Sequence, residues 1–189
     1  MKFKQLDITG FKSFSDKTSF LIENGLTGIV GPNGCGKSNI VEALRWCMGE
    51  NSAKSMRGSG MEDVIFSGTS NRASKNISEV SLLLDNQSKE CPAQYKEFDE
   101  ITVRRKIEKD KGSKYYVNDK EVRARDVQTL FADLSTGAHS PSLISQGKIG
   151  QLVTSKPIER KSILEEAAGI SGIHARRQEA ETRLNAAEN

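Results

Sequence analysis

The sequence predicts an α/β fold built on a mixed sheet with an antiparallel subdomain, and three observations support this prediction. A glycine-rich segment at 31–38 follows an apolar run at 26–30 and precedes a helix-like stretch at 40–46. Apolar residues alternate with polar or basic ones at 101–107, as in an antiparallel strand. Segment 157–189 has no proline after its first residue, so we expect it to be helical.

The segment from Gly31 to Ser38 has the pattern G-x-x-x-x-G-K-S, with the expected strand before it and helix after it. Glycines let the backbone N–H groups surround a phosphate chain, and Lys37 brings a positive charge to the β and γ phosphates. Ser38 is placed to bind Mg²⁺. The pattern predicts a nucleoside triphosphate site; the alternative is a chance match to a glycine-rich turn. Cys35 occupies a variable position and is interpreted as a bystander.

The composition is that of an ordinary soluble domain, with 189 residues of which 35% are hydrophobic and 28% charged. The sequence has neither an apolar run long enough to span a bilayer nor a signal-peptide core, so we expect a cytoplasmic protein without a membrane partner. The cysteines are odd in number and form no C-x-x-C pair, which argues against a disulfide framework or zinc site. We expect reduced thiols at Cys35, Cys47 and Cys91.

The first third of the chain is expected to form a small sheet and one helix. Short strands are predicted at 6–8 and 19–22, and the helix after the glycine-rich segment should end near Gly49. Residues 50–76 are rich in Ser, Gly, Asn and Lys, interrupted by the apolar residues 64–66. This pattern predicts a long surface excursion held by one short buried segment.

The middle of the chain is expected to form antiparallel hairpins. Strands are predicted at 80–84, 101–107 and 115–117, with a further turn at 118–119. A helix is then indicated by the spacing of Val127, Leu130, Phe131 and Leu134.

The last segment has the spacing of a coiled coil. Residues four and three positions apart form a heptad seam that includes one long basic side chain: Ile173, Arg177, Ala180, Leu184 and Ala187. Two domains are therefore expected, a globular part at 1–156 and a neck helix with the start of a coiled coil at 157–189. An ordinary amphipathic helix packed on its own domain is the alternative, because two heptads do not exclude it.

Basic residues are concentrated between 104 and 125, although the net charge is only +3. The concentration suggests a basic patch, and a solvated hairpin whose charges only keep it soluble is an equal alternative. The basic residues are Arg104, Arg105, Lys106, Lys109, Lys111, Lys114, Lys120, Arg123 and Arg125.

The apolar run 82–84 followed by Asp85 resembles the Mg²⁺-binding strand of a nucleotide hydrolase. However, Asn86 follows where a catalytic glutamate is wanted, and no Ser-Gly-Gly signature precedes the run. We therefore interpret Asp85 as the end of a peripheral strand and expect the catalytic carboxylates to be missing from this chain.

Several separated segments together resemble one family, the bacterial SMC (structural maintenance of chromosomes) proteins, over essentially the whole chain. Their combination is more specific than the phosphate loop alone. The segments are 10–14, 31–39, 55–58, 61–66, 144–147 and 165–170.

The resemblance implies the N-terminal half of a P-loop NTPase head of the ABC-ATPase type, with a protruding coiled-coil helix. It implies that the signature motif, the Mg²⁺-binding Asp and the catalytic Glu lie in a C-terminal half of the same head. It further implies a second SMC subunit in a homodimer, a kleisin-type subunit and double-stranded DNA bound without strong sequence preference. The implied function is ATP-dependent chromosome condensation and segregation in the nucleoid, with ATP and Mg²⁺ as cofactors.

The resemblance also implies roles for single residues. Gln146 matches the Q-loop glutamine, which completes the Mg²⁺ shell together with Ser38 and senses the γ-phosphate. Arg57 matches the arginine of the R-loop, which lies near the triphosphate and acts beside Lys37. The implied nucleotide-binding residues are Lys12, Ser13, Gly31, Pro32, Asn33, Gly34, Cys35, Gly36, Lys37, Ser38 and Asn39.

For DNA, the family carries basic residues at the positions of Arg123 and Arg125, and Arg104 and Arg105 are weaker candidates. At position 60, where relatives can carry a lysine, this chain has Gly60. We therefore expect phosphate contacts from the other basic residues.

Two other functions compete with this interpretation. A split-head DNA-repair ATPase of the recombination and repair type would share the phosphate loop, but the segments 55–66 and 144–147 argue against it. An ABC transporter subunit predicts Thr or Ser at position 39 and a shorter gap before the Q-loop, whereas this chain has Asn39.

Overall fold

The computed structural model describes residues 1–89, 91–134, 150 and 153–168, together with 177, 180, 181, 184 and 185. In this part of the chain, six strands form one sheet in the order β2-β1-β3-β4-β5-β6, with every neighbouring pair antiparallel. The strands are β1 Lys2–Thr9, β2 Thr18–Leu21, β3 Ile77–Asp85, β4 Glu100–Glu108, β5 Gly112–Val117 and β6 Lys120–Val122.

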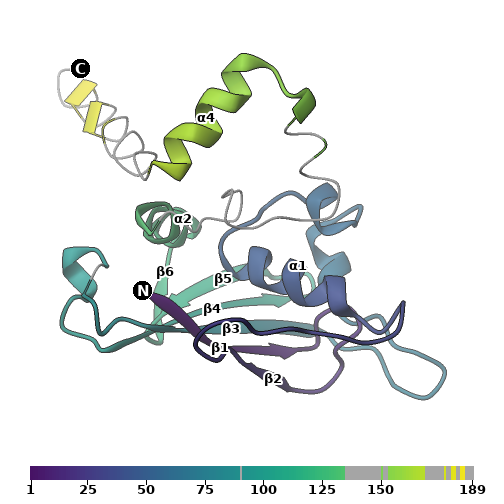
Figure 1. Ribbon diagram of the computed structural model, residues 1–189. Helices are drawn as coiled ribbons and strands as arrows, with labels where there is room; N and C mark the ends of the chain where they lie inside the picture. Colours follow the sequence, from purple (N-terminus) through teal and green to yellow (C-terminus); the bar gives the residue numbers. More distant parts are fainter. Residues whose placement is uncertain are drawn as a thin grey trace.

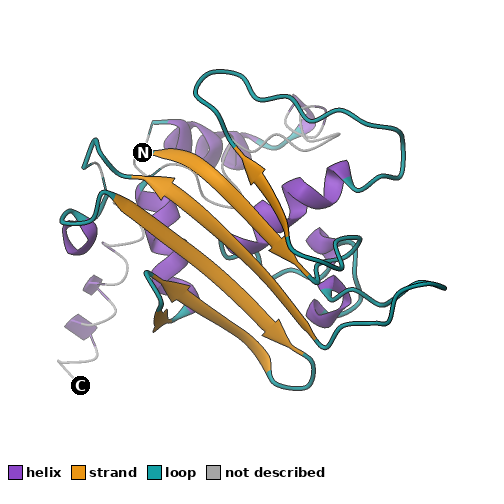
Figure 2. Cartoon of the chain, turned by 90° about the horizontal axis from the view of Figure 1, so that it is seen from below, coloured by secondary structure: helices purple, strands orange, loops and turns teal. Residues whose placement is uncertain are grey.

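The helices lie on one side of this sheet (Figure 1). Helices α1 and α2 lie over the sheet, and α4 lies beyond them. Figure 2 looks onto the opposite face, where the strands lie in front of the helices. The α-helices are α1 Lys37–Cys47, α2 Ala124–Asp133 and α4 Pro157–Ala167, and the short 3₁₀ helices are η1 Lys54–Met56, η2 Met61–Val64 and η3 Ala93–Tyr95.

The strand periodicity determines which residues face the helices. Inward residues alternate with outward polar residues, because successive side chains of a strand point to opposite faces. The predicted strands at 6–8, 80–84, 101–107 and 115–117 all lie within observed strands, and the one predicted at 19–22 extends one residue beyond β2, which ends at Leu21. The buried core on the inner face of the sheet includes Leu6, Ile8, Val80, Leu82, Leu84, Ile101, Val103, Ile107, Tyr115 and Val117.

Helix α1 begins directly after Gly36, whose φ of 92° is left-handed, and ends near Gly49 as expected. Its buried face packs onto the inner side of β3 and β4 through Ile40, Ala43, Trp46 and Cys47. The carbonyl oxygen of Gly49 accepts a hydrogen bond of 2.8 Å from the side chain of Gln128, which joins the end of α1 to α2. The predicted helix around Val127 is therefore confirmed, and it lies beside α1.

The long excursion at 50–76 is held as predicted by its short apolar segment. Val64, Ile65 and Phe66 are buried. Backbone hydrogen bonds join this segment to residues 10–12: the Phe66 N–H donates to the Gly10 carbonyl at 2.8 Å, and the Lys12 N–H donates to the Val64 carbonyl at 2.7 Å. The excursion thus returns to the start of the chain, beside α1.

One strand prediction is wrong. The apolar run at 26–30 is not a strand, and Leu26 and Val30 are 100% and 93% exposed. A strand needs a hydrogen-bonded neighbour, and none of the described residues pairs with this run. The described sheet is accordingly antiparallel rather than mixed.

Two further details differ from expectation. Strand β6 had no sequence prediction, and β3, which ends at Asp85, lies inside the sheet rather than at its periphery. The Asp85 carboxylate accepts a hydrogen bond of 2.9 Å from the Gln87 backbone N–H, so it closes the turn after β3.

Helix α4 begins at Pro157 as predicted, because proline needs no hydrogen-bond acceptor in a first helical turn. Its apolar residues Ile158 and Leu164 are 82% and 70% exposed. Of the heptad residues, Arg177, Ala180 and Leu184 are helical, whereas Ile173 and Ala187 lie outside the described residues. The coiled coil and the division at 156 and 157 therefore stay predictions.

Candidate nucleotide-binding site

The phosphate loop needs glycine at specific points. Gly34 and Gly36 have φ of 84° and 92°, a region that side chains rarely adopt. A Cβ at Gly36 would also lie 2.7 Å from the Ser13 hydroxyl oxygen. The phosphate loop therefore lies close to the turn that carries Ser13.

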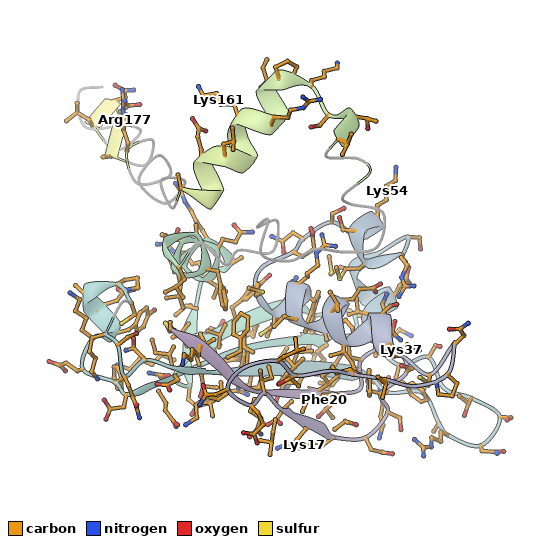
Figure 3. All side chains as sticks on the ribbon, in the orientation of Figure 1. Lys17, Phe20, Lys37, Lys54, Lys161 and Arg177 are labelled. Carbon is orange, nitrogen blue, oxygen red and sulfur yellow. The ribbon has the colours of Figure 1, made fainter. Side chains whose placement is uncertain are left out.

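Lys37 is the first residue of α1 and lies at the end of this helix in Figure 3. Its ammonium donates to the carbonyl oxygens of Gly31 and Pro32 at 2.6 and 2.5 Å. The Ser38 side chain is exposed at the same helix start, and the first turn of α1 contains no acidic residue. The Lys37 ammonium and the positive end of the α1 dipole thus both lie at the phosphate loop. This combination favours binding of an anion.

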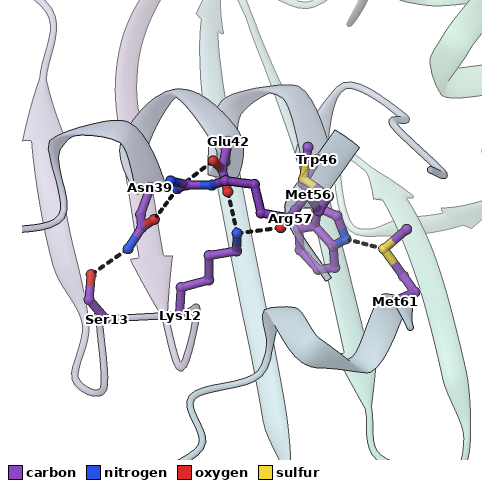
Figure 4. A network of polar contacts seen from close by, with 8 residues as sticks. All are labelled: Lys12, Ser13, Asn39, Glu42, Trp46, Met56, Arg57 and Met61. Atoms are coloured by element: carbon purple, nitrogen blue, oxygen red, sulfur yellow. Dashed lines mark hydrogen bonds and ion pairs between the residues drawn. The ribbon is translucent and has the colours of Figure 1, made fainter. Parts of the chain in front are cut away.

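Glu42 joins two basic residues from different loops beside the phosphate loop (Figure 4). One carboxylate oxygen forms an ion pair with Lys12, and the other lies 2.5 Å from the Arg57 guanidinium. Lys12 also donates to the Met56 carbonyl oxygen at 2.5 Å. The side chains of Glu42 and Lys12 are only 11% and 14% exposed, whereas that of Arg57 is 59% exposed.

Asn39 extends this network toward the first turn of the chain. It accepts a hydrogen bond of 2.9 Å from Arg57 through its side-chain oxygen and donates one of 2.9 Å to the Ser13 hydroxyl. Asn39 and Glu42 are three positions apart and therefore share one face of α1. The predicted residues Lys12, Ser13, Asn39 and Arg57 thus lie together at the start of α1.

The backbone at the two basic residues is unusual. Lys12 and Arg57 have φ of 48° and 54°, although neither is glycine. Left-handed conformations of this kind cost on the order of 1 kcal/mol and persist where surrounding contacts hold them. The contacts with Glu42 hold both residues in this conformation. The loops that carry Lys12 and Arg57 are therefore fixed where these side chains meet α1.

Sequence reasoning missed Glu42. It is the one acidic residue of α1, and it lies in the same helix as the phosphate-loop lysine. An acid on the inward side of such a helix was a usable signal, because a buried carboxylate needs partners.

Arg105 was predicted as a weak DNA contact, and this prediction is wrong. It is 2% exposed, and its guanidinium lies 4.4 Å from the Trp46 ring centre and 4.6 Å from that of Tyr115. It donates to the carbonyl oxygens of Trp46 and Glu50 at 2.8 and 2.7 Å. Arg105 therefore donates hydrogen bonds to carbonyl oxygens at the C-terminal end of α1, and it cannot reach a DNA phosphate.

Arg104 points to the other face of the sheet, where its charge is already matched. Its guanidinium lies 3.3 Å from the Glu79 carboxylate and 3.1 Å from that of Asp119, and it stacks on the Tyr116 ring at 4.4 Å. This pairing makes Arg104 less suited to phosphate contact than an exposed arginine.

Arg123 and Arg125 lie exposed at the start of α2. The Arg123 guanidinium forms an ion pair of 3.2 Å with Asp126, and its hydrogen bond lowers the pKa of that carboxyl group. The structure thus leaves both predicted DNA contacts at the surface.

Some predicted features fall outside the described residues or are not seen among them. Gln146 lies outside them, so its predicted role is untested. The described residues contain no group of three or more His, Cys, Asp or Glu side chains able to hold a metal, and no helix long and apolar enough to cross a bilayer. The cysteines are unpaired; Cys35 is exposed, and burial raises the pKa of the Cys47 thiol to about 12.

Comparison with known proteins agrees with this geometry. The model of the RecF/RecN/SMC N terminal domain family matches residues 2–148. The chromosome partition proteins Smc of Cereibacter sphaeroides and Rhodopseudomonas palustris are 58% and 56% identical over 188 residues, which cover 100% of this chain. The chain spans 16% of the length of each of these relatives.

The fold of this chain is also similar to that of a solved Smc head. An Smc head bound to the C-winged helix domain of ScpA is 30% identical with a TM-score of 0.84, over 90% of this chain and 52% of that one. The resemblance to bacterial SMC heads and the α/β half-head fold are thereby confirmed. The chain therefore belongs to the RecF/RecN/SMC N-terminal domain family, and the curated relatives that it resembles over its whole length are chromosome partition proteins Smc.

Proposed function

We propose that this chain is the ATP-binding N-terminal lobe of the head of a chromosome-partition ATPase. The observation that carries the proposal is the phosphate loop, with left-handed Gly34 and Gly36 and the Lys37 ammonium directed onto the loop. The confirmed resemblance to Smc proteins supports the same conclusion. Residues 1–156 would form the lobe, and 157–189 the neck and the start of a coiled coil.

The residues present fit ATP with Mg²⁺. Gly36 has no Cβ where the loop passes Ser13, and the exposed hydroxyl of Ser38 is a hard oxygen ligand of the kind Mg²⁺ prefers. Lys37 would bind the β and γ phosphates, and Arg57 would lie near the triphosphate. Gln146 is proposed to complete the metal shell. The bound metal would neutralise phosphate charge.

Hydrolysis is proposed to need a C-terminal half of the same head. Asp85 closes a turn, and the described residues offer no cluster of carboxylates. Further proposed partners are a second copy of the SMC subunit, a kleisin-type subunit and duplex DNA. The kleisin is suggested because a similar Smc head is bound to ScpA. With these partners, the protein would lie in the cytoplasm and associate with the nucleoid.

We expect the 189-residue chain alone to have no measurable ATP turnover, because the Mg²⁺-binding Asp and the catalytic Glu are proposed to lie in the C-terminal half of the head. Mixing it with a C-terminal head segment of the same protein should produce turnover. Phosphate release at saturating ATP measures both. The matched control is the same mixture carrying Lys37→Ala. If the chain alone hydrolyses ATP and Lys37→Ala abolishes this activity, the proposal is refuted. Asp85 would then again be a candidate metal ligand.

The DNA proposal predicts that Arg123→Glu with Arg125→Glu weakens duplex binding equally for all sequences and leaves ATP binding intact. Each lost phosphate contact reduces counterion release, so the slope of log affinity against log salt should become shallower by about two units at most. Binding of a reconstituted head to duplexes across a salt series measures this slope.

The matched control for DNA binding is Lys17→Glu with Arg72→Glu, which changes the same charge near β2. The side chains of Lys17 and Arg72 pair with Asp7 and Asp16 and are 66% and 61% exposed. An unchanged slope in the Arg123 and Arg125 variant, or an equal change in the control, would show that these arginines are only solvated.

A further inference from the structure

Glu42 has no role in the functions described so far, yet it is the one carboxylate at the centre of the candidate site (Figure 4). We propose that Glu42 is a positioning residue that holds Arg57 beside the phosphate loop, so that the guanidinium is oriented before a triphosphate is bound. The inference rests on the proposed ATP-binding function and adds the residue on which the position of Arg57 depends.

The first argument is that each of the two carboxylate oxygens of Glu42 binds a different cation. Oε1 of Glu42 lies 2.5 Å from the Arg57 guanidinium, and Oε2 pairs with Lys12. The two cations come from loops 45 residues apart, and α1 supplies the acid between them. A single carboxylate therefore fixes both loops against the helix that begins at the phosphate loop.

The second argument is burial. The Glu42 side chain is 11% exposed, so its attraction to the two cations is screened much less than that of a surface pair. A buried carboxylate is costly unless charged partners compensate it, and here there are two. One net positive charge remains in this group, and Lys37 adds another at the start of the same helix.

The third argument is that Arg57 would otherwise be free to move. Its side chain is 59% exposed, and Gly58 and Ser59 follow it in a loop. Arginine has many rotamers, and fixing it only when a ligand binds costs affinity or rate. Glu42 and Asn39 hold the guanidinium from one helix face, an arrangement that orients the group in advance.

The test is a double-mutant cycle in a head reconstituted from this chain and a C-terminal head segment. Glu42→Gln keeps the shape but removes the charge, and we expect kcat to fall about tenfold while the KM for ATP changes less than about threefold, since Lys37 and the loop amides still bind phosphate. In an Arg57→Ala background, Glu42→Gln should lower kcat by no more than about twofold, because only its contact with Lys12 then remains to be lost.

Glu50→Gln is the matched control. Glu50 is a buried glutamate just after the same helix, its side chain is 2% exposed, and it pairs with Arg45 at 3.0 Å. Its loss should lower thermal stability but change kcat less than about twofold, with the same small effect in the Arg57→Ala background.

Three results would overturn the inference: an unchanged kcat in Glu42→Gln, the full fall in kcat from Glu42→Gln persisting in the Arg57→Ala background, or an equal fall in kcat in Glu50→Gln. If Glu42→Gln does not fold, Lys12→Met with Glu42→Gln removes a buried cation together with the acid. It is then compared with Lys12→Met alone, under the same criteria. Full ATP binding in a Lys37→Ala head would instead reject the proposed function, whatever Glu42 does.

Discussion

Replacement of Lys37 by alanine is expected to abolish ATP binding by the reconstituted head. The Lys37 ammonium lies over the phosphate loop, 2.6 Å from the Gly31 carbonyl oxygen, and no other described residue of the loop carries a positive charge. Charge-assisted hydrogen bonds to phosphate contribute about 1.5–3 kcal/mol each, so losing them should weaken affinity by roughly a hundredfold or more. Isothermal titration with a non-hydrolysable ATP analogue measures this directly.

Lys17→Ala is the control for this loss of charge. Lys17 lies on the underside of the sheet in Figure 3, away from Lys37, and pairs with Asp7 at 3.3 Å. Its removal should leave the nucleotide affinity unchanged. Equal affinities for the wild type and Lys37→Ala would mean that the loop does not hold the triphosphate.

The second large effect is expected on stability. Arg105→Ala should lower the free energy of unfolding by about 3 kcal/mol, because it removes a buried cation that satisfies the carbonyl oxygens of Trp46 and Glu50. It also leaves a cavity between the rings of Trp46 and Tyr115. Urea unfolding of the chain followed by far-ultraviolet circular dichroism gives this value.

The neighbouring substitution Arg104→Ala is the matched control. Arg104 has the same side chain on the same strand, but its pairs with Glu79 and Asp119 lie on the outer face, where ion pairs contribute less than about 1 kcal/mol. Similar losses for both variants would contradict the assignment of Arg105 to the interior. A DNA affinity lowered by Arg105→Ala without loss of stability would also contradict it.

The sequence alone predicted those parts of the molecule whose signal is local. The phosphate loop, the helix after it and the hairpin strands follow from spacing within a few residues, and all except the strand at 26–30 are present. That strand failed because pairing depends on a neighbour, which the apolar run itself does not specify. Its exposed Leu26 and Val30 show that hydrophobicity alone does not make a strand.

The error at Arg105 has a physical lesson. Residues 101, 103 and 107 face the core, and Arg105 has the same parity, so the alternation of β4 already directed it inward. Charge composition suggested a surface patch, but strand periodicity was the stronger signal. The position of Glu42 was harder to predict, because its two partners come from distant loops that only the fold brings to α1.

The chain has a single tryptophan, and its position gives the molecule a built-in optical probe. Trp46 is fully buried, its ring lies 5.4 Å from that of Phe11, and its indole N–H donates to the Met61 sulfur at 3.3 Å. Indole emission depends on local polarity and on neighbouring charges. Fluorescence from this one residue therefore reports, without any label, on the junction between α1, the sheet and the excursion that carries Arg57.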